Sequence, residues 1–435
     1  MKMKKSTLLT AALLVLSMST PVLAQDQAGT VSYSDVEQLQ ADNALAKKLK
    51  ITGYVQTQFQ KADTAGIASF AGGDFASGVD NRIAVRRGRV KFAYDNDNAQ
   101  AVLQFDITEK GLAIKDANLT ILDPWLNTVS LTGGVFDRPF GYEISYSSST
   151  RETPERSRVF QTLFPGERDL GGRLTIQAPK TSTWNFLKLD LGLMNGNGTN
   201  VETDSYKDFI GHLSATKTST DEKFKWGLGA SYYKGGFAYA SDKLYTMKNG
   251  GTDKGFILET VKKGDQSLRQ YLGVDAQLSY DWSLGITQFR GEYLFGTQPA
   301  TDTKSSSLTA ANTGKDVYSR PFNGYYAYLI QNVLQTPLQA VVKYDVYDPN
   351  TLVSGNEIGR AVTTAGMLKT GSADVKYSTL GIGLNYRWNS NVKFMAYYDI
   401  VRNETTSNIV KASTLEDLSH DRKDNVFTFR VQYKF

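Results

Sequence analysis

The sequence predicts an all-β protein, a 16-stranded antiparallel transmembrane β-barrel with a long third loop folded into its lumen and a short N-terminal periplasmic helix. Three observations predict this fold. An export signal opens the chain, and apolar and polar residues then alternate to the last residue. The connections between the alternating segments are alternately long and short. Alternation with a period of two is typical of strands with one apolar face and one polar face.

The first 24 residues have the layout of a signal peptide. Lys2, Lys4 and Lys5 precede an apolar run, and Ala24 ends a cleavage site of small residues. Removing this segment lowers the formal net charge from +5 to +2, because it contains three lysines and no acid. No later apolar run reaches the ~20 residues that a spanning helix needs. The exported chain is therefore either soluble outside the inner membrane or crosses a membrane with strands.

Residues 25–48 form a polar leader before the alternating region. Ser34 and Glu37 make a capping box, which predicts the short periplasmic helix; a trimerising coil is the alternative. The predicted organisation is a signal peptide at 1–24, the leader, and a β-barrel at 49–435.

Sixteen alternating segments follow the leader. They are 49–61, 81–94, 100–109, 115–123, 127–136, 168–179, 186–195, 207–217, 223–234, 270–281, 284–296, 320–333, 337–348, 374–389, 391–403 and 424–435. Long connections alternate with tight ones, which is typical of outer-membrane barrels with extracellular loops and periplasmic turns. All five tryptophans lie in or beside the tight connections, as expected at a membrane interface: Trp125, Trp184, Trp226, Trp282 and Trp388.

Basic residues outnumber acidic ones on the polar faces, which we assign to the lumen. Because the last strand of a closed barrel lies beside the first, several basic residues share one arc, which we call the basic wall: Arg87, Arg89, Lys91, Arg387, Lys393 and Arg430. We expect the basic wall to face the third loop, so that the field between them favours anions. The alternative is a solvated lumen with scattered, neutralised charges.

The third loop, residues 137–167, is long and rich in charge. Its candidate constriction residues, with those that follow it, are Arg138, Glu143, Arg151, Glu152, Glu155, Arg156, Arg158, Arg168 and Asp169. A loop of this size can fold into the lumen and narrow it. Its arginines either bind an anion through guanidinium forks or pair with neighbouring carboxylates and hold the shape of the loop.

Few residues in the chain suit catalysis or metal binding. Cysteine is absent, which excludes thiolate chemistry, and the two histidines have no spacing typical of a catalytic site. We expect His212 to be a wall residue and His420 a surface residue. The sequence predicts no enzyme activity, no cofactor, no metal and no nucleic-acid partner.

The region around the third loop carries a family resemblance. The segments that carry it are Phe136–Glu143 (FDRPFGYE), Ser147–Ser149, Glu155–Ser157 and Pro165–Gly171. Here the sequence resembles the phosphate-selective porin O and P family, in the branch found in outer membranes of Bacteroidota. The terminal Phe435 resembles the signal that barrel-assembly machinery recognises. Phosphate selectivity itself transfers poorly, because the third loop contains no lysine.

The resemblance implies a homotrimeric porin, surrounded by the lipid of the bacterial outer membrane, with the third loop in its lumen. We expect passive diffusion of small hydrophilic solutes with a weak preference for anions, phosphate among them. The alternative is an outer-membrane barrel enzyme or a surface adhesin without channel activity.

Overall fold

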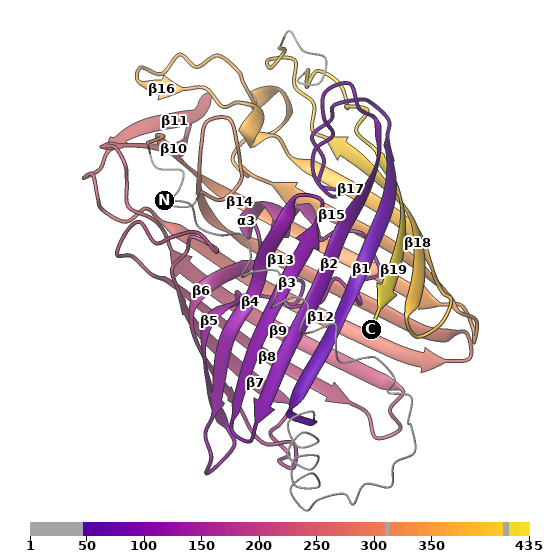
Figure 1. Cartoon of the computed structure of the whole chain (residues 1–435). Coiled ribbons are helices and arrows are strands. Elements are labelled where there is room, and N and C mark those ends of the chain that lie inside the picture. Colours follow the sequence, from indigo (N-terminus) through magenta and orange to yellow (C-terminus); the bar gives the residue numbers. More distant parts are fainter. Residues whose placement is uncertain (1–46, 309–313, 412–416) are drawn as a thin grey trace, which may run out of the picture. The chain divides into compact units, whose positions relative to one another are not determined.

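The computed structural model describes residues 47–308, 314–411 and 417–435. The predicted signal peptide, and the leader up to residue 46, lie outside the described residues. From Leu49 onward the described residues form a closed antiparallel barrel, and all sixteen predicted strands are confirmed (Figure 1). The barrel strands are β1 (Leu49–Ala62), β2 (Asn81–Asn96), β3 (Ala99–Thr108), β4 (Gly111–Leu122), β5 (Val129–Asp137), β6 (Arg168–Gln177), β7 (Leu187–Met194), β8 (Asp208–Thr218), β9 (Phe224–Gly235), β12 (Arg269–Trp282), β13 (Gly285–Ala300), β14 (Val317–Asn332), β15 (Leu338–Asp348), β17 (Tyr377–Arg387), β18 (Val392–Asn403) and β19 (Val426–Lys434).

Strand β1 closes the barrel, because it pairs with β2 on one side and with β19 on the other. Two irregularities interrupt the ladders of the first four strands. Gln56 lies opposite Arg87 while Thr57 lies opposite Val85, which leaves Arg86 as an extra residue in β2. A similar shift in the β3–β4 ladder makes Lys115 an extra residue in β4. Such β-bulges turn two consecutive side chains toward one face of a sheet.

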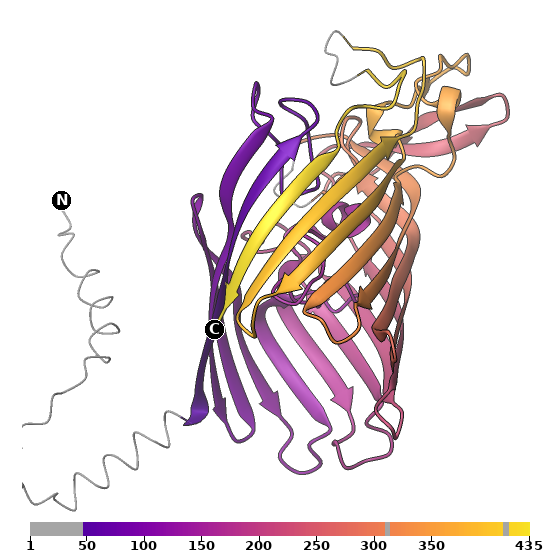
Figure 2. The ribbon, with the colours of Figure 1, turned by 90° about the vertical axis from the view of Figure 1, so that its right-hand side faces the viewer.

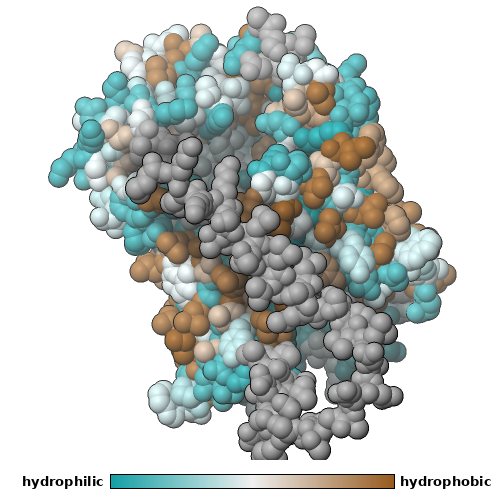
Figure 3. Space-filling view, viewed as in Figure 1, coloured by the Kyte–Doolittle hydropathy of each residue, from teal (hydrophilic) through white to brown (hydrophobic). Residues whose placement is uncertain are grey.

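The outer wall is apolar. Exposed aliphatic residues occupy alternate positions of the strands, among them Leu103, Ile114, Leu131, Leu193 and Ile382. In Figure 3 most hydrophobic side chains gather on this wall, whereas the loops at the upper end are mainly hydrophilic. Among the described residues, no helix is long and apolar enough to cross a membrane.

The strand pattern did not predict three short strands outside the barrel. These are β10 (Lys243–Gly250) and β11 (Asp253–Thr260), which form a hairpin, and β16 (Met367–Leu368), which pairs with β11. Phe256 of the hairpin packs into a small apolar cluster with loop residues Val353, Ile358 and Val375. The long loops therefore have a core of their own at the end of the barrel opposite the short turns.

Candidate functional site: the third loop in the barrel lumen

The third loop, with its short helix α3 (Arg158–Leu163), lies inside the barrel (Figures 1 and 2). Its polar contacts with the wall begin at β1, where the Tyr54 hydroxyl lies 2.5 Å from Ser148 Oγ and Gln56 Nε2 donates to the Ser148 carbonyl over 3.0 Å. On β19, Gln432 donates to the Ser149 carbonyl over 2.9 Å. The tip of the loop is therefore fixed to the two strands that close the barrel.

Glu155 holds the loop to the wall through three arginines. Its carboxylate accepts hydrogen bonds from Arg86 (2.8 and 2.9 Å), Arg87 (2.7 Å) and Arg430 (3.0 Å). Burial would raise the pKa of Glu155, but these guanidinium groups outweigh it and hold that pKa well below its usual value. Glu155 is thus an ionised anchor in the lumen.

The β-bulge in β2 makes this arrangement possible. In a regular strand Arg86 and Arg87 would point to opposite faces. With Arg86 as the extra residue, both side chains reach the same carboxylate. Sequence alternation predicted that Arg87 faces the lumen but missed Arg86, because a bulge leaves no clear signal in the alternating pattern.

A second anchor lies at Glu152. Its carboxylate accepts two hydrogen bonds from Arg290 of β13, at 2.9 and 3.1 Å, and this guanidinium lies over the ring of Tyr146, 4.4 Å from its centroid. Asn385 of β17 donates to the Glu152 carbonyl over 2.9 Å. Lys393 of the basic wall donates to the backbone carbonyl of Arg151, also over 2.9 Å.

Glu143 belongs to the buried polar contacts between loop and wall. Its carboxylate accepts hydrogen bonds from Ser157 and from the Tyr328 hydroxyl (2.8 Å), and its backbone N–H donates to Glu292 of β13. Gly141 has a φ of 61°, and a Cβ there would collide with the Glu292 carboxylate. Glycine therefore lets the loop approach β13 this closely.

An apolar face of the loop packs against the opposite strands. Phe164 stacks on Tyr233 of β9 with ring centroids 5.9 Å apart and meets Tyr271 of β12 edge-on at 5.8 Å. The loop residues of this cluster are Phe140, Ile144, Val159, Phe160, Leu163 and Phe164, all almost fully buried. Aromatic burial of this extent stabilises a single loop position.

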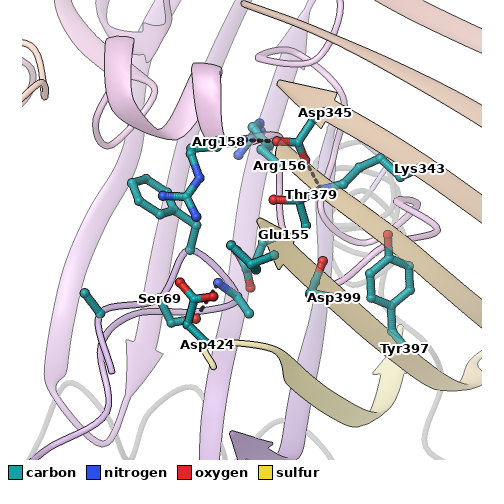
Figure 4. A pocket seen from close by; sticks show the side chains of 14 residues that line it. Ser69, Glu155, Arg156, Arg158, Lys343, Asp345, Thr379, Tyr397, Asp399 and Asp424 are labelled. Carbon is teal, nitrogen blue, oxygen red and sulfur yellow. Dashed lines mark hydrogen bonds and ion pairs between the residues drawn. The ribbon is translucent and has the colours of Figure 1, made fainter. Parts of the chain in front are cut away.

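Arg158 connects the third loop with two other segments. Its guanidinium lies between the rings of Phe70, in the first loop, and Tyr377 of β17, at 4.3 and 4.1 Å from their centroids. Its backbone N–H donates to Asp345 of β15. Figure 4 shows the charged residues that converge beside Arg158, around a cavity of about 20 Å³. That volume holds about one water.

The other loop arginines pair with carboxylates near the base of the loop. Arg156 pairs with Glu167, Arg168 with Asp116 (3.1 Å) and Arg138 with Asp169 (3.0 Å). Burial, with Arg151 nearby, lowers the pKa of Arg156 to about 9. The Arg151 side chain is buried, and its Nε and Nη1 atoms have no hydrogen-bond partner among the described residues.

The basic wall is in contact with the loop. Arg87 and Arg430 bind Glu155 directly, Lys393 binds the loop backbone, and Arg89 pairs with Asp106 at 3.3 Å. Lys91 is half-buried and Arg387 is exposed at the end of β17. One loop carboxylate, Glu155, therefore holds two of the six basic-wall residues, and a strand carboxylate, Asp106, holds a third.

Larger cavities lie above and below the loop. One of about 450 Å³, at the end with the long loops, is lined by Lys115 and Arg168 with uncharged residues. Two others, of about 770 and 380 Å³, open at the end with the short turns. The charged residues that line these two are Lys180, Lys217, Lys225, Arg290, Arg387, Lys393 and Lys434, with Glu152 as the one acid. Sequence reasoning missed Lys180 and Lys217, which lie in or next to turns.

The histidines are not part of a cluster. His212 Nε2 lies 3.3 Å from Asp275 on the lumen side of β8, and His420 is exposed. In the described parts of the chain, no group of three or more histidine and carboxylate side chains has the arrangement of a metal site.

No family model and no curated protein matches the sequence. Its fold is similar to solved structures of outer-membrane channels. The Pseudomonas putida OprB structure has a TM-score of 0.56 at 7% identity, covering 93% of this chain and 96% of that one. An anion-selective porin from Comamonas acidovorans has a TM-score of 0.51 at 10% identity (89% and 99% covered), and the channel DcaP of Acinetobacter baumannii 0.50 at 13% identity (89% and 97%).

These likenesses show the fold. A closed antiparallel barrel with an apolar exterior satisfies every backbone hydrogen bond of its wall within the sheet, which is what a lipid environment requires. The chain is a barrel of the bacterial outer membrane.

Proposed function

We propose that this barrel is a porin, through which small hydrophilic solutes diffuse passively, with a weak preference for anions. The observation that carries the proposal is the cavity of about 770 Å³ at the short-turn end. Lys180, Lys217 and Lys225 line it outside any ion pair with a described residue, and its fourth charged lining residue, Arg290, pairs with Glu152. Short turns lie on the periplasmic side of such barrels. We call this cavity the vestibule. A basic cavity of this kind raises the local concentration of anions and repels cations.

The anion preference rests on the vestibule rather than on the third loop. The loop carboxylates Glu155 and Glu152 are held in ion pairs, Glu155 with Arg86, Arg87 and Arg430 and Glu152 with Arg290, and these pairs serve to fix the loop. Phosphate is one candidate solute, in keeping with the resemblance of the loop region to phosphate-selective porins. The same resemblance supports assembly as a homotrimer.

Planar bilayers test the proposal. Purified protein is expected to give stable conductance in triplet steps, and a salt gradient is expected to give a reversal potential on the anion side. A folded barrel without conductance would contradict the porin function. A cation-selective conductance would contradict the anion preference alone.

A further inference from the structure

We infer that solutes pass the third loop on one side only, between the loop and the lumen-facing residues of β3 to β8, and that the arc from β15 through the closure to β1 is sealed. This inference rests on the proposed porin function and specifies which residues would meet the solute.

On the sealed arc, lumen-facing side chains are buried although they point into the barrel. Gln339, Asn385, Met395, Thr428, Arg430 and Gln60 are each at most 4% exposed. The third loop covers part of this set, because the carbonyls of Glu152 and Pro154 accept hydrogen bonds from Asn385 and Arg430. Gln60 lies under the first loop, where it donates to the Ala71 carbonyl, and it also donates to Thr428. Interiors packed to this degree leave no continuous path for water.

The cavities on this arc do not join into a path. The one beside Arg158 holds about 20 Å³, room for about one water. The cavity of about 380 Å³ below the loop is lined by Ser149, Thr150 and Glu152, which are loop residues that lie over it. Because these residues are themselves bonded to the wall, we interpret this cavity as a blind pocket of the periplasmic vestibule.

On the opposite arc, most titratable side chains facing the lumen retain contact with water, whereas Asp190 of β7 is buried. Exposed side-chain fractions are 38% for Lys188, 23% for Arg173, and 12–13% for Asp106, Asp116 and His212. The cavity of about 450 Å³ at the long-loop end borders β4, and the cavity of about 770 Å³ at the short-turn end borders β6 and β8 and extends to β9, β12 and β13. Both ends of a route are therefore present on this arc.

The charges along this route indicate the class of solute. The acids are paired: Asp116 with Arg168 (3.1 Å) and Asp190 with Lys188 (2.8 Å). At the periplasmic end, Lys180, Lys217 and Lys225 form no ion pair with any described residue. Small anions would thus meet balanced charges at the narrow part and free positive charge below it.

The chain contains no cysteine, so single introduced cysteines report access without background. We would compare two matched pairs in the full-length protein. Gln104→Cys on β3 and Ser214→Cys on β8 face the open arc, where both native residues are partly exposed. Gln60→Cys on β1 and Thr428→Cys on β19 face the sealed arc, where both native residues are fully buried.

A bulky, charged thiol reagent is added to open channels in a planar bilayer. Modification of Gln104→Cys and Ser214→Cys is expected to remove most of the current, whereas Gln60→Cys and Thr428→Cys should keep the unmodified conductance and should not be labelled. Each variant must first show wild-type conductance, and mass spectrometry of the folded protein reports labelling independently of current. Equal block from Thr428→Cys would overturn the one-sided route. If the unmodified wild-type protein shows no conductance at all, the porin function itself is contradicted.

Discussion

At the scale of single residues, the charges that hold the third loop act through direct contacts. Alternation predicted that Arg87 and Arg430 face the lumen, and the loop composition pointed to Glu155 as a candidate. The sequence could not predict that the two arginines contact Glu155. Alternation shows which face of a strand a residue occupies, but not where a loop folds. The contribution of Arg86 depends on a β-bulge that the sequence does not reveal.

Replacing Glu155 tests the anchor. Glu155→Gln would leave three guanidinium groups without their counter-charge, and breaking a buried pair of this kind costs about 3–5 kcal/mol. We expect the loop to leave its position intermittently, seen as noisy, larger conductance and as faster proteolysis within the loop. Glu109→Gln, at an exposed turn residue, is the control and should behave as wild type. Quiet, wild-type current from Glu155→Gln would show that the apolar contacts alone hold the loop.

The depressed pKa of Glu155 fixes the pH dependence of this anchor. A carboxylate whose pKa is lower in the folded state contributes stability that is fully present above its unfolded pKa, about 4.3, and is lost as the pH falls through the lower folded value. Conductance noise should therefore stay constant from neutral pH down to about pH 4 and should rise only in stronger acid. If the conductance noise already rises between neutral pH and about pH 5, a titratable group other than Glu155 controls the position of the loop.

At the scale of elements, the sequence predicted the wall better than the loops. A strand with one face in lipid must alternate, so all sixteen barrel strands were recognisable. The hairpin of β10 and β11 is held by a loop cluster around Met247 and Phe256, and such local packing imposes no long alternating pattern. The same applies to the third loop, whose apolar residues Phe160 and Phe164 are core residues of the lumen.

Asp253 connects the β10–β11 hairpin to the neighbouring loop. Its carboxylate accepts hydrogen bonds from the backbone and hydroxyl groups of Thr363 and Thr364, at 2.7–2.8 Å, and these bonds lower its pKa to about 2. Asp253→Asn should loosen the hairpin, so that trypsin cleaves there faster while conductance is unchanged. Glu259→Gln removes an exposed pair with Lys248 and is the matched control, because such surface pairs contribute little. Equal cleavage of the two variants would contradict the role of Asp253.

Deleting residues 145–160 tests the third loop as an element. The deletion removes Glu152 and Glu155, and it leaves Arg87, Arg290 and Arg430 facing water without their partners. Single-channel conductance should increase, and the reversal potential should move further toward anions. Removal of the hairpin residues 243–260, which lie outside the barrel, is the control of similar length and should change neither quantity. Unchanged conductance after the first deletion would mean that the loop does not limit the current.

At the scale of the whole barrel, free charge is distributed unevenly along the lumen. Ion pairs lie in the middle, whereas Lys180, Lys217 and Lys225, which form no ion pair with a described residue, gather at the short-turn end. The sequence predicted an excess of basic residues in the lumen but not where along the lumen they gather. Lys180 and Lys217 lie in or next to turns, where alternation does not show which way a side chain points. An uneven distribution of this kind should make conduction depend on which side holds the dilute salt.

On the proposed porin function, we expect the vestibule lysines to set the ion preference. The triple variant Lys180→Ser, Lys217→Ser and Lys225→Ser should shift the reversal potential toward zero, most strongly with the dilute solution on the periplasmic side. The shift should be large at about 0.1 M salt, where the Debye length of ~10 Å approaches the size of the vestibule, and small at about 1 M, where it is ~3 Å. The matched triple Lys243→Ser, Lys262→Ser and Lys263→Ser, on and beside the extracellular hairpin, should leave the potential unchanged. If both triples give the wild-type potential, the anion preference does not originate in the vestibule.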